Sequence, residues 1–179
     1  NLENALALQP DSATAHITLG MLLMDRNELD AAVAKVEEGL RLEPDNPTTY
    51  ARLGMLMQIR GEPDKAADYY RKVISLSPLD GTAHRSLAFS RRTTEYNDER
   101  KRMEHAIRAQ DVSSWDRILL GFALGKVFDD LGQYDKAFQY LHAANQRHRQ
   151  SFKYSVEKQQ AFIERHKQGL DQALLDHCK

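Results

Sequence analysis

The sequence predicts an all-α fold, a solenoid of antiparallel helix pairs, because three kinds of residue recur along it with one period. Prolines stand 34 residues apart, at Pro10, Pro44 and Pro78. Small residues share this spacing within helical patterns, at Gly20, Gly54 and Ala88. Two alanines are also 34 residues apart, at Ala32 and Ala66. The agreement of these marks in one register indicates a repeated structural unit.

The residue types indicate how each unit is built from two helices. A small residue on the first helix allows the second to approach closely, at Gly20, Gly54, Ala88 and Gly125. Glycine inside a helix costs about 1 kcal/mol relative to alanine, so its recurrence there needs a packing reason. Leucines just before these residues contribute to an apolar stripe with helical period. Each proline ends the second helix, because it lacks an N–H group and restricts the preceding residue.

Capping residues mark where the first helices start. Ser12, Asn46 and Asp80 occupy N-cap positions, and Ser113 with Asp116 has the spacing of a capping box. We therefore predict four helix pairs, at 13–26 with 29–42, 47–60 with 63–76, 81–94 with 97–109, and 114–131 with 134–148.

The repeated residues resemble the consensus of the tetratricopeptide repeat family. The closest match in the chain consists of Tyr50, Leu53, Gly54, Gly61, Ala66, Tyr70 and Pro78. A second good match consists of Leu124, Gly125, Phe128, Gly132 and Ala137, with Arg149 where proline would stand. The unit between them is degraded, since Arg91 and Arg100 replace apolar and small residues. This resemblance implies a right-handed superhelical solenoid.

The expected division of the chain follows from this register. Residues 1–10 read as the second helix of a preceding repeat, and full repeats are expected at 11–46, 47–80, 81–112 (degenerate) and 113–149. Residues 150–179 contain a polar helical pattern that we expect to cap the stack or to act as a linker. Because the pattern opens within a repeat, we expect the chain to be part of a larger protein, with self-association through its N-terminal end as a lesser alternative.

The composition excludes several classes of partner. Lys and Arg total 25 against 26 for Asp and Glu, so no net field favours nucleic acid or an anionic membrane. The sequence has no apolar run of the roughly 20 residues that span a bilayer, and no signal-peptide pattern at its start. The single cysteine, Cys178, agrees with a reducing compartment. A cytoplasmic protein is expected.

No motif predicts a catalytic, metal or cofactor site. The segment from Gly121 to Val127 superficially resembles a phosphate-binding loop, but its glycines are too close and Val127 replaces the Ser or Thr that binds magnesium. Close helix packing is the preferred interpretation. The seven histidines form no helical pair with an evident third ligand. The charge-rich stretch 91–102 is interpreted as a solvated turn rather than a docking patch.

The resemblance implies a protein-binding scaffold whose concave groove is formed by the first helices. Matching the groove positions of the family to this chain gives Ile17, Met21, Met24, Arg52, Met55, Arg85, Phe89, Arg92, Phe122 and Lys126. Methionine adapts to irregular partners, and arginine beside phenylalanine can bind a carboxylate while stacking. We expect a peptide or protein segment with apolar and acidic anchors. Alternatively, the methionines contact neighbouring repeats or the C-terminal helix.

A second resemblance supplies a competing function. Residues 113–165 are similar to the last repeat and linker of bacterial proteins in which tetratricopeptide repeats precede a sulfotransferase domain, notably through FALGK, DDLG and the run YDKAF. This resemblance implies a non-catalytic arm of a larger enzyme. The glycine-rich loop of that catalytic domain does not occur in the 179 residues, so no catalytic residue is transferred.

Overall fold

The structure is a computed structural model that describes residues 11–151 and 156–177. The described residues form helices and no strand, which confirms the predicted all-α class. The chain divides into two compact units, residues 1–147 and residues 148–179. The helical interpretation of residues 1–10 lies outside the described residues.

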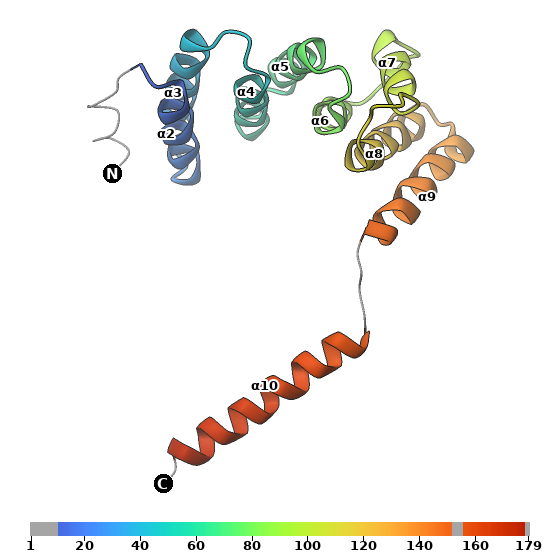
Figure 1. The fold of residues 1–179 in the computed structure, drawn as a ribbon. Helices are drawn as coiled ribbons and strands as arrows, with labels where there is room; N and C mark the ends of the chain where they lie inside the picture. The colour runs from blue at the N-terminus through green and yellow to red at the C-terminus, as the bar shows by residue number, and fades with distance from the viewer. Residues whose placement is uncertain (1–10, 152–155, 178–179) are drawn as a thin grey trace. The chain divides into compact units, whose positions relative to one another are not determined.

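The first unit contains α2 (Ala13–Asp25), α3 (Leu29–Leu42), α4 (Pro47–Ile59), α5 (Pro63–Leu76), α6 (Gly81–Ser90), α7 (Asp98–Ala106), α8 (Ser114–Asp130) and most of α9 (Tyr134–Ser151). In Figure 1, α3, α5 and α7 lie along one side of this unit, and α2, α4, α6 and α8 lie along the other. Helix α2 packs on α3 and α4 packs on α5. Helix α6 packs against α5 and along α8.

Side-chain caps start the first helices as predicted. Asn46 accepts hydrogen bonds from the backbone N–H groups of Thr48 and Thr49, and Pro47 occupies the first turn. Ser113 Oγ accepts a bond of 3.0 Å from the Asp116 N–H and donates to the Asp116 carboxylate at 2.5 Å. These contacts satisfy N–H groups that a helix start leaves unpaired, so they fix where α4 and α8 begin.

Three of the turns between paired helices share one backbone device. Asn27, Gly61 and Gly132 each adopt a positive φ, of 63°, 77° and 70°. This left-handed conformation ends a helix and reverses the chain, and glycine adopts it without a steric cost. The turn after α6 has no such residue among those described.

The prediction that α6 extends to residue 94 is wrong. The helix ends at Ser90, and Arg91 is extended with φ −150° and ψ 160°. The Thr93 N–H donates to Asp130 Oδ2 at 2.8 Å instead of to a carbonyl of the preceding turn. The segment 91–97, which we name the strap, therefore leaves the helix to contact α8.

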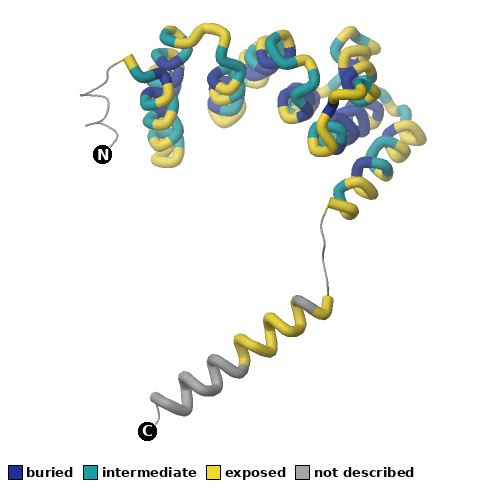
Figure 2. The backbone as a smooth tube through the Cα atoms, in the orientation of Figure 1, coloured by how far each residue is buried: buried dark blue, intermediate teal, exposed yellow. Residues whose placement is uncertain are grey.

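The small residues bring paired helices close together, as the sequence predicts. A Cβ atom added at Gly54 would lie 2.7 Å from the Tyr70 ring, and one added at Gly125 would lie 2.5 Å from Leu141. The glycines of α8 are thus packing residues of a helix pair. Figure 2 shows the buried residues concentrated between the paired helices. They form two core clusters, one extending from Ala32 to Leu87 and the other from Ala88 to Ala137.

The second unit contains the end of α9 and α10 (Val156–His177). The described side chains of α10 are exposed, including Val156, Phe162 and Ile163. A helix at this place in the sequence was expected, whereas its role as a cap or linker stays a prediction. Among the described residues, no helix combines the length and apolarity needed to cross a membrane.

Candidate functional site

A cavity of about 450 Å³ lies between the first helices α4 and α6. We name it the groove cavity. Its α4 side consists of Pro47, Thr48, Ala51, Arg52, Met55 and Gln58. Its α6 side consists of Thr82, Ala83 and Ser86, with Asp80 at the helix start, and Tyr70 of α5 also lines it. The cavity is therefore formed where two neighbouring repeats meet.

Tyr70 shapes the groove cavity from within the α4–α5 pair. It can lie against α4 because Gly54 has no side chain, and it remains only 4% exposed. Its hydroxyl donates to Gln58 Oε1 at 2.8 Å, which holds the Gln58 amide beside the cavity. Burial raises the pKa of the Tyr70 hydroxyl, so this group stays a neutral donor.

The charged side chains that α4 and α6 contribute beside the groove cavity are arginines. Helix α4 (PTTYARLGMLMQI) and helix α6 (GTAHRSLAFS) contain no acidic residue. Arg52 and Arg85 are exposed, and neither forms an ion pair within the part of the chain that the structure describes. The Asp80 carboxylate accepts a bond of 2.9 Å from the Ala83 N–H, so its role is to cap α6. Two cationic groups therefore remain available to a ligand.

A second group of predicted residues converges beyond the groove cavity. Phe89 is 51% exposed, and the Arg85 guanidinium lies 5.1 Å from its ring centroid. Lys126 Nζ of α8 lies 5.9 Å from the same ring. Lys126 also forms an ion pair with Asp130, four residues later on α8. The arrangement presents an exposed aromatic face with two cations beside it, on neighbouring first helices.

The ten predicted groove residues occupy different environments. Arg52 and Met55 line the groove cavity, and Arg85, Phe89 and Lys126 form the aromatic group. The α2 residues Ile17, Met21 and Met24 are partly buried and do not line the groove cavity.

Contacts of the α2 residues explain their burial. Ile17 lies against Gly39 of α3, where an added Cβ would be 2.7 Å from the Ile17 side chain. Met24 packs against the first core cluster. Ile17 therefore packs within its own helix pair and Met24 packs against the core, while the alternative that the methionines contact neighbouring repeats or the C-terminal helix stays open. Phe122 is half-buried on α8.

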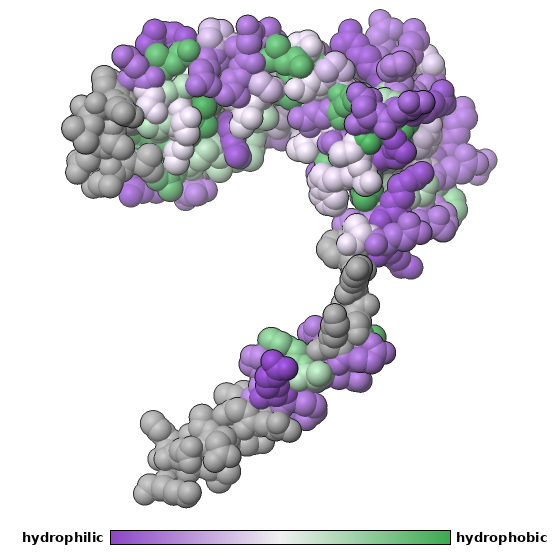
Figure 3. All heavy atoms as spheres, viewed as in Figure 1, coloured by the Kyte–Doolittle hydropathy of each residue, from purple (hydrophilic) through white to green (hydrophobic). Residues whose placement is uncertain are grey.

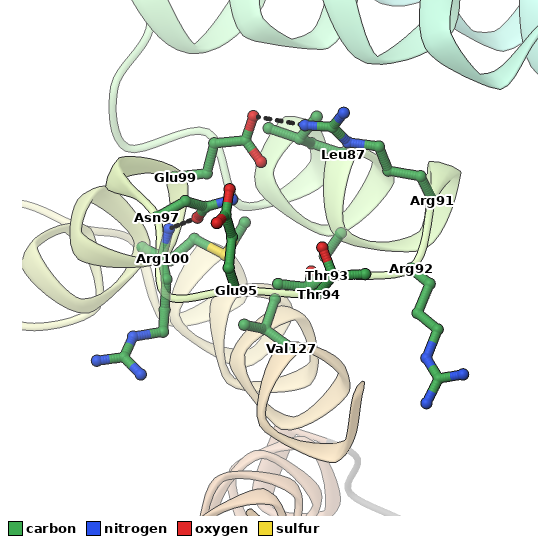
Figure 4. Close-up of a pocket in the computed structure, with 12 residues that line it drawn as sticks. Leu87, Arg91, Arg92, Thr93, Thr94, Glu95, Asn97, Glu99, Arg100 and Val127 are labelled. Carbon is green, nitrogen blue, oxygen red and sulfur yellow. Dashed lines mark hydrogen bonds and ion pairs between the residues drawn. The ribbon is translucent and has the colours of Figure 1, made fainter. Parts of the chain in front are cut away.

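The strap encloses a small polar cavity of about 110 Å³ between α6, α7 and α8 (Figure 4). Arg91 pairs with Glu99 at 3.4 Å, and Glu99 also accepts a bond of 2.7 Å from Arg71. Arg92 contributes to the lining, but its side chain extends away from the other labelled residues in Figure 4. Arg92 is exposed on the strap.

The interpretation of residues 91–102 as a solvated turn is wrong for Arg100. This residue is 7% exposed, and its guanidinium lies 3.1 Å from the Tyr96 ring centroid and 5.0 Å from that of Phe128. The arginine replaces a small residue of the repeat pattern and fills the space between α7, the strap and α8. Stacking on two rings offsets part of the cost of removing the charge from water.

Sequence reasoning missed several residues of the site. Gln58 lies one helical turn after Met55, so helical periodicity could have found it. Tyr70 carries no such signal, since its position in the repeat pattern predicts a core residue. Among the described residues, no group of His, Cys, Asp or Glu is arranged to hold a metal ion.

Comparisons with known proteins identify the repeats. Tetratricopeptide repeat families match residues 1–47 and residues 47–78. No curated protein matches the sequence. A crystal structure of MamA is similar over 86% of this chain and 88% of that chain, with a TM-score of 0.63 and 19% identity. YrrB, a TPR protein with an unusual peptide-binding site, is similar over 82% of this chain and 74% of that chain, with a TM-score of 0.56 and 19% identity.

The family matches confirm tetratricopeptide repeats within residues 1–78, and the similar structures confirm the helical fold. The finer resemblance of residues 113–165 to the arm of a sulfotransferase stays a prediction. Figure 3 shows polar residues gathered over α7 and α8 and more apolar surface over α2 and α4, so the repeats differ in surface character. Residues 1–78 carry tetratricopeptide repeats, and the described chain has the all-α fold of such proteins.

Proposed function

We propose that the first unit is a protein-interaction scaffold that binds a segment of a partner protein in the groove cavity and over the neighbouring Phe89 ring. The observation that carries this proposal is the pair of exposed arginines, Arg52 and Arg85, on two adjacent helices without acidic residues. An exposed cationic groove with apolar walls favours a ligand that combines carboxylates with apolar side chains.

The residues have distinct roles in this proposal. Met55 and Ala51 provide apolar contacts, and the unbranched methionine can adapt to a partner side chain. Arg52 and Arg85 bind carboxylates, and the stacking of Arg85 on Phe89 limits its rotamers before the ligand arrives. The similar fold of YrrB supports a peptide ligand, because that protein is described as having a peptide-binding site. No catalytic group is assigned to the site.

A binding experiment with synthetic peptides tests the proposal. Twelve-residue fluorescein-labelled peptides with leucine anchors and acidic, neutral or basic flanks are titrated with the full chain, and fluorescence anisotropy is measured. We expect the acidic peptide to bind and the double variant Met55→Glu, Arg85→Glu to weaken its binding by about tenfold or more, because both an apolar and a charged contact are lost.

Arg108→Glu is the matched control, since Arg108 is exposed and lies outside the groove cavity. It should bind the acidic peptide as the unchanged protein does. Unaltered binding by the double variant, or no preference for the acidic peptide, would remove the basis of the groove proposal.

The alternative function is the non-catalytic arm of a larger enzyme, a sulfotransferase according to the resemblance of residues 113–165. Reading the gene downstream of Lys179 distinguishes the two. A sulfotransferase domain in frame would support the arm, whereas a stop codon or an unrelated domain would eliminate it.

A further inference from the structure

A second hollow of about 490 Å³ lies between α5 and α7, on the side of the second helices. We name it the α5–α7 hollow. Its apolar walls are Ile74, Pro78, Leu79 and Ala106. The proposed groove function does not use any of these residues, and the lining shares none with the groove cavity.

The preceding junction, between α3 and α5, shows what this hollow lacks. There the half-buried Tyr69 of α5 packs against the first core cluster, with its ring centroid 6.4 Å from that of Tyr50. Burial, and to a smaller extent the charge of Glu37 on α3, raises the pKa of the Tyr69 hydroxyl, as expected for a ring set between the two helices. Two large rings therefore lie together at the first junction.

The arrangement of buried residues shows which residue takes the place of Tyr69 on α7. Arg100, Met103 and Ala106 are the buried residues of α7, and they match the buried residues Ala67, Tyr70 and Val73 of α5 with a shift of 33. The same shift places Arg102 at the position of Tyr69.

On the first helices, the period of 34 places His84 at the position of Tyr50. Burial lowers the pKa of His84, and its Nε2 lies 2.9 Å from the carbonyl oxygen of Pro78, which lines the hollow. In this register, His84 and Arg102 stand where Tyr50 and Tyr69 stand at the first junction. An exposed arginine does not fill the volume of a packed phenol ring, and the hollow remains open.

The rim of the α5–α7 hollow is cationic. Lys101, Arg102 and His105 are exposed and line it, whereas no acidic residue does. Lys101 pairs with Asp98 at 2.9 Å. Arg102 forms no ion pair with any residue that the structure describes, so its charge is available to a partner.

We propose that the α5–α7 hollow is a docking site for an acidic segment of a partner protein that inserts one aromatic side chain. The aromatic side chain replaces the ring that Tyr69 supplies at the first junction, and it buries its area against Ile74, Leu79 and Ala106. Carboxylates on either side of the aromatic residue bind Arg102 and Lys101. The residues that line the rim include these two cations and no acid, so the rim favours an acidic segment.

The variant Arg102→Tyr tests this site by restoring the residue type of the first junction. The probe is a fluorescein-labelled peptide with one tryptophan flanked by glutamates, compared with peptides in which glycine replaces tryptophan or lysines replace the glutamates. The full chain should bind the first peptide and should bind the other two at least about tenfold more weakly. Arg102→Tyr should weaken binding of the first peptide by a similar factor, because its ring occupies the hollow.

Arg102→Glu provides a second test at an exposed position that does not depend on repacking. It should also weaken binding, and added salt should reduce the difference between this variant and the unchanged protein. Arg108→Glu, at an exposed position outside both cavities, is the matched charge-reversal control and should leave binding of the tryptophan peptide unchanged. Circular dichroism verifies that each variant is folded.

Chemical-shift mapping of the tryptophan peptide onto ¹⁵N-labelled protein distinguishes this site from the groove. We expect shifts at Ile74, Leu79 and Ala106. No binding by the unchanged protein, equal binding by folded Arg102→Tyr, or shifts at Ala51 and Met55 in place of the hollow would each overturn the proposal. If the double variant Met55→Glu, Arg85→Glu still bound the acidic leucine peptide, the groove proposal would fail but the result for the α5–α7 hollow would stand.

Discussion

Arg100 shows how one side chain replaces the small-residue packing of a regular repeat. Its side chain is 8% exposed, and its Nε lies 3.5 Å from Glu104 Oε1. Tyr96 of the strap and Phe128 of α8 lie within stacking distance of the guanidinium. The residue therefore connects α7 and the adjoining strap to α8, which is distant in sequence.

We predict that Arg100→Ala lowers the free energy of unfolding by about 2 kcal/mol, since it removes a largely desolvated stacking contact and leaves a cavity. Arg100→Lys should recover only part of this loss, because an ammonium group does not stack as a planar guanidinium does. Urea unfolding followed by circular dichroism measures both. Lys101→Ala, an exposed neighbour, is the control and should change stability by less than about 0.5 kcal/mol. Equal stability of Arg100→Ala and Lys101→Ala would show that the stacking is energetically unimportant.

The sequence identified Arg100 as a residue that breaks the repeat pattern, but not what it contacts. The repeat register predicts a small residue at this position, and nothing local indicates that Phe128 of α8 approaches it. Similarly, the sequence predicts Arg85 beside Phe89 from one helix, whereas Lys126 joins them only through the packing of α6 along α8. Contacts between helices depend on the fold, and they cannot be predicted from the periodicity of a single helix.

At the scale of elements, the strap and the end of α8 are held by one carboxylate. Asp130 accepts a hydrogen bond from the Thr93 N–H and forms an ion pair with Lys126, and its side chain is 9% exposed. The same carboxylate thus binds the segment that follows α6 and restrains Lys126, which lies beside the Phe89 ring. This coupling explains why the predicted end of α6 is wrong, because the residue that redirects the chain lies 37 positions later.

We predict that Asp130→Ala loosens the strap while the helix pairs remain folded. The Thr93 amide loses its acceptor, so its hydrogen exchange should become at least about tenfold faster. This factor corresponds to a decrease of about 1.4 kcal/mol in the free energy of local opening. Asp129→Ala is the matched control, since Asp129 is adjacent and exposed. Amide exchange followed by NMR measures both variants. Unchanged exchange at Thr93 in folded Asp130→Ala would contradict the assigned role.

The starts of the helices could be predicted closely because their signals are local. Asn46 and Ser113 cap α4 and α8 through bonds to N–H groups no more than three residues away. The turn at Gly61 likewise depends on one residue that tolerates positive φ. Where the stabilising contact is local, the sequence is sufficient to predict the end of a helix. The path of the strap could not be predicted in this way, because its partner Asp130 belongs to another helix.

At the scale of the whole molecule, the two core clusters are continuous along the helix pairs. The first extends from Ala32 to Leu87 and the second from Ala88 to Ala137, so adjacent residues of α6 belong to different clusters. In a repeat protein each unit is stabilised by its neighbours, and stability is approximately a sum of such local terms. Both clusters lie within the first compact unit, residues 1–147.

We therefore predict that a chain ending at Ser151 folds without α10. Its thermal midpoint should lie within about 4 °C of that of the full chain, corresponding to a loss of no more than about 1 kcal/mol for a domain of this size. The acidic leucine peptide should also bind it with unchanged affinity, because the groove cavity is formed by α4, α5 and α6.

The matched comparison is a chain ending at Leu131, which removes α9 and with it Ala137 of the second core cluster. Its partners Leu124 and Phe128 would then be exposed, and we expect a midpoint lower by at least about 10 °C or a loss of cooperative unfolding. Differential scanning calorimetry measures the three chains. A chain ending at Ser151 that unfolds like the one ending at Leu131 would show that α10 stabilises the repeats. Full stability of the shorter chain would show that α9 is dispensable to the second core.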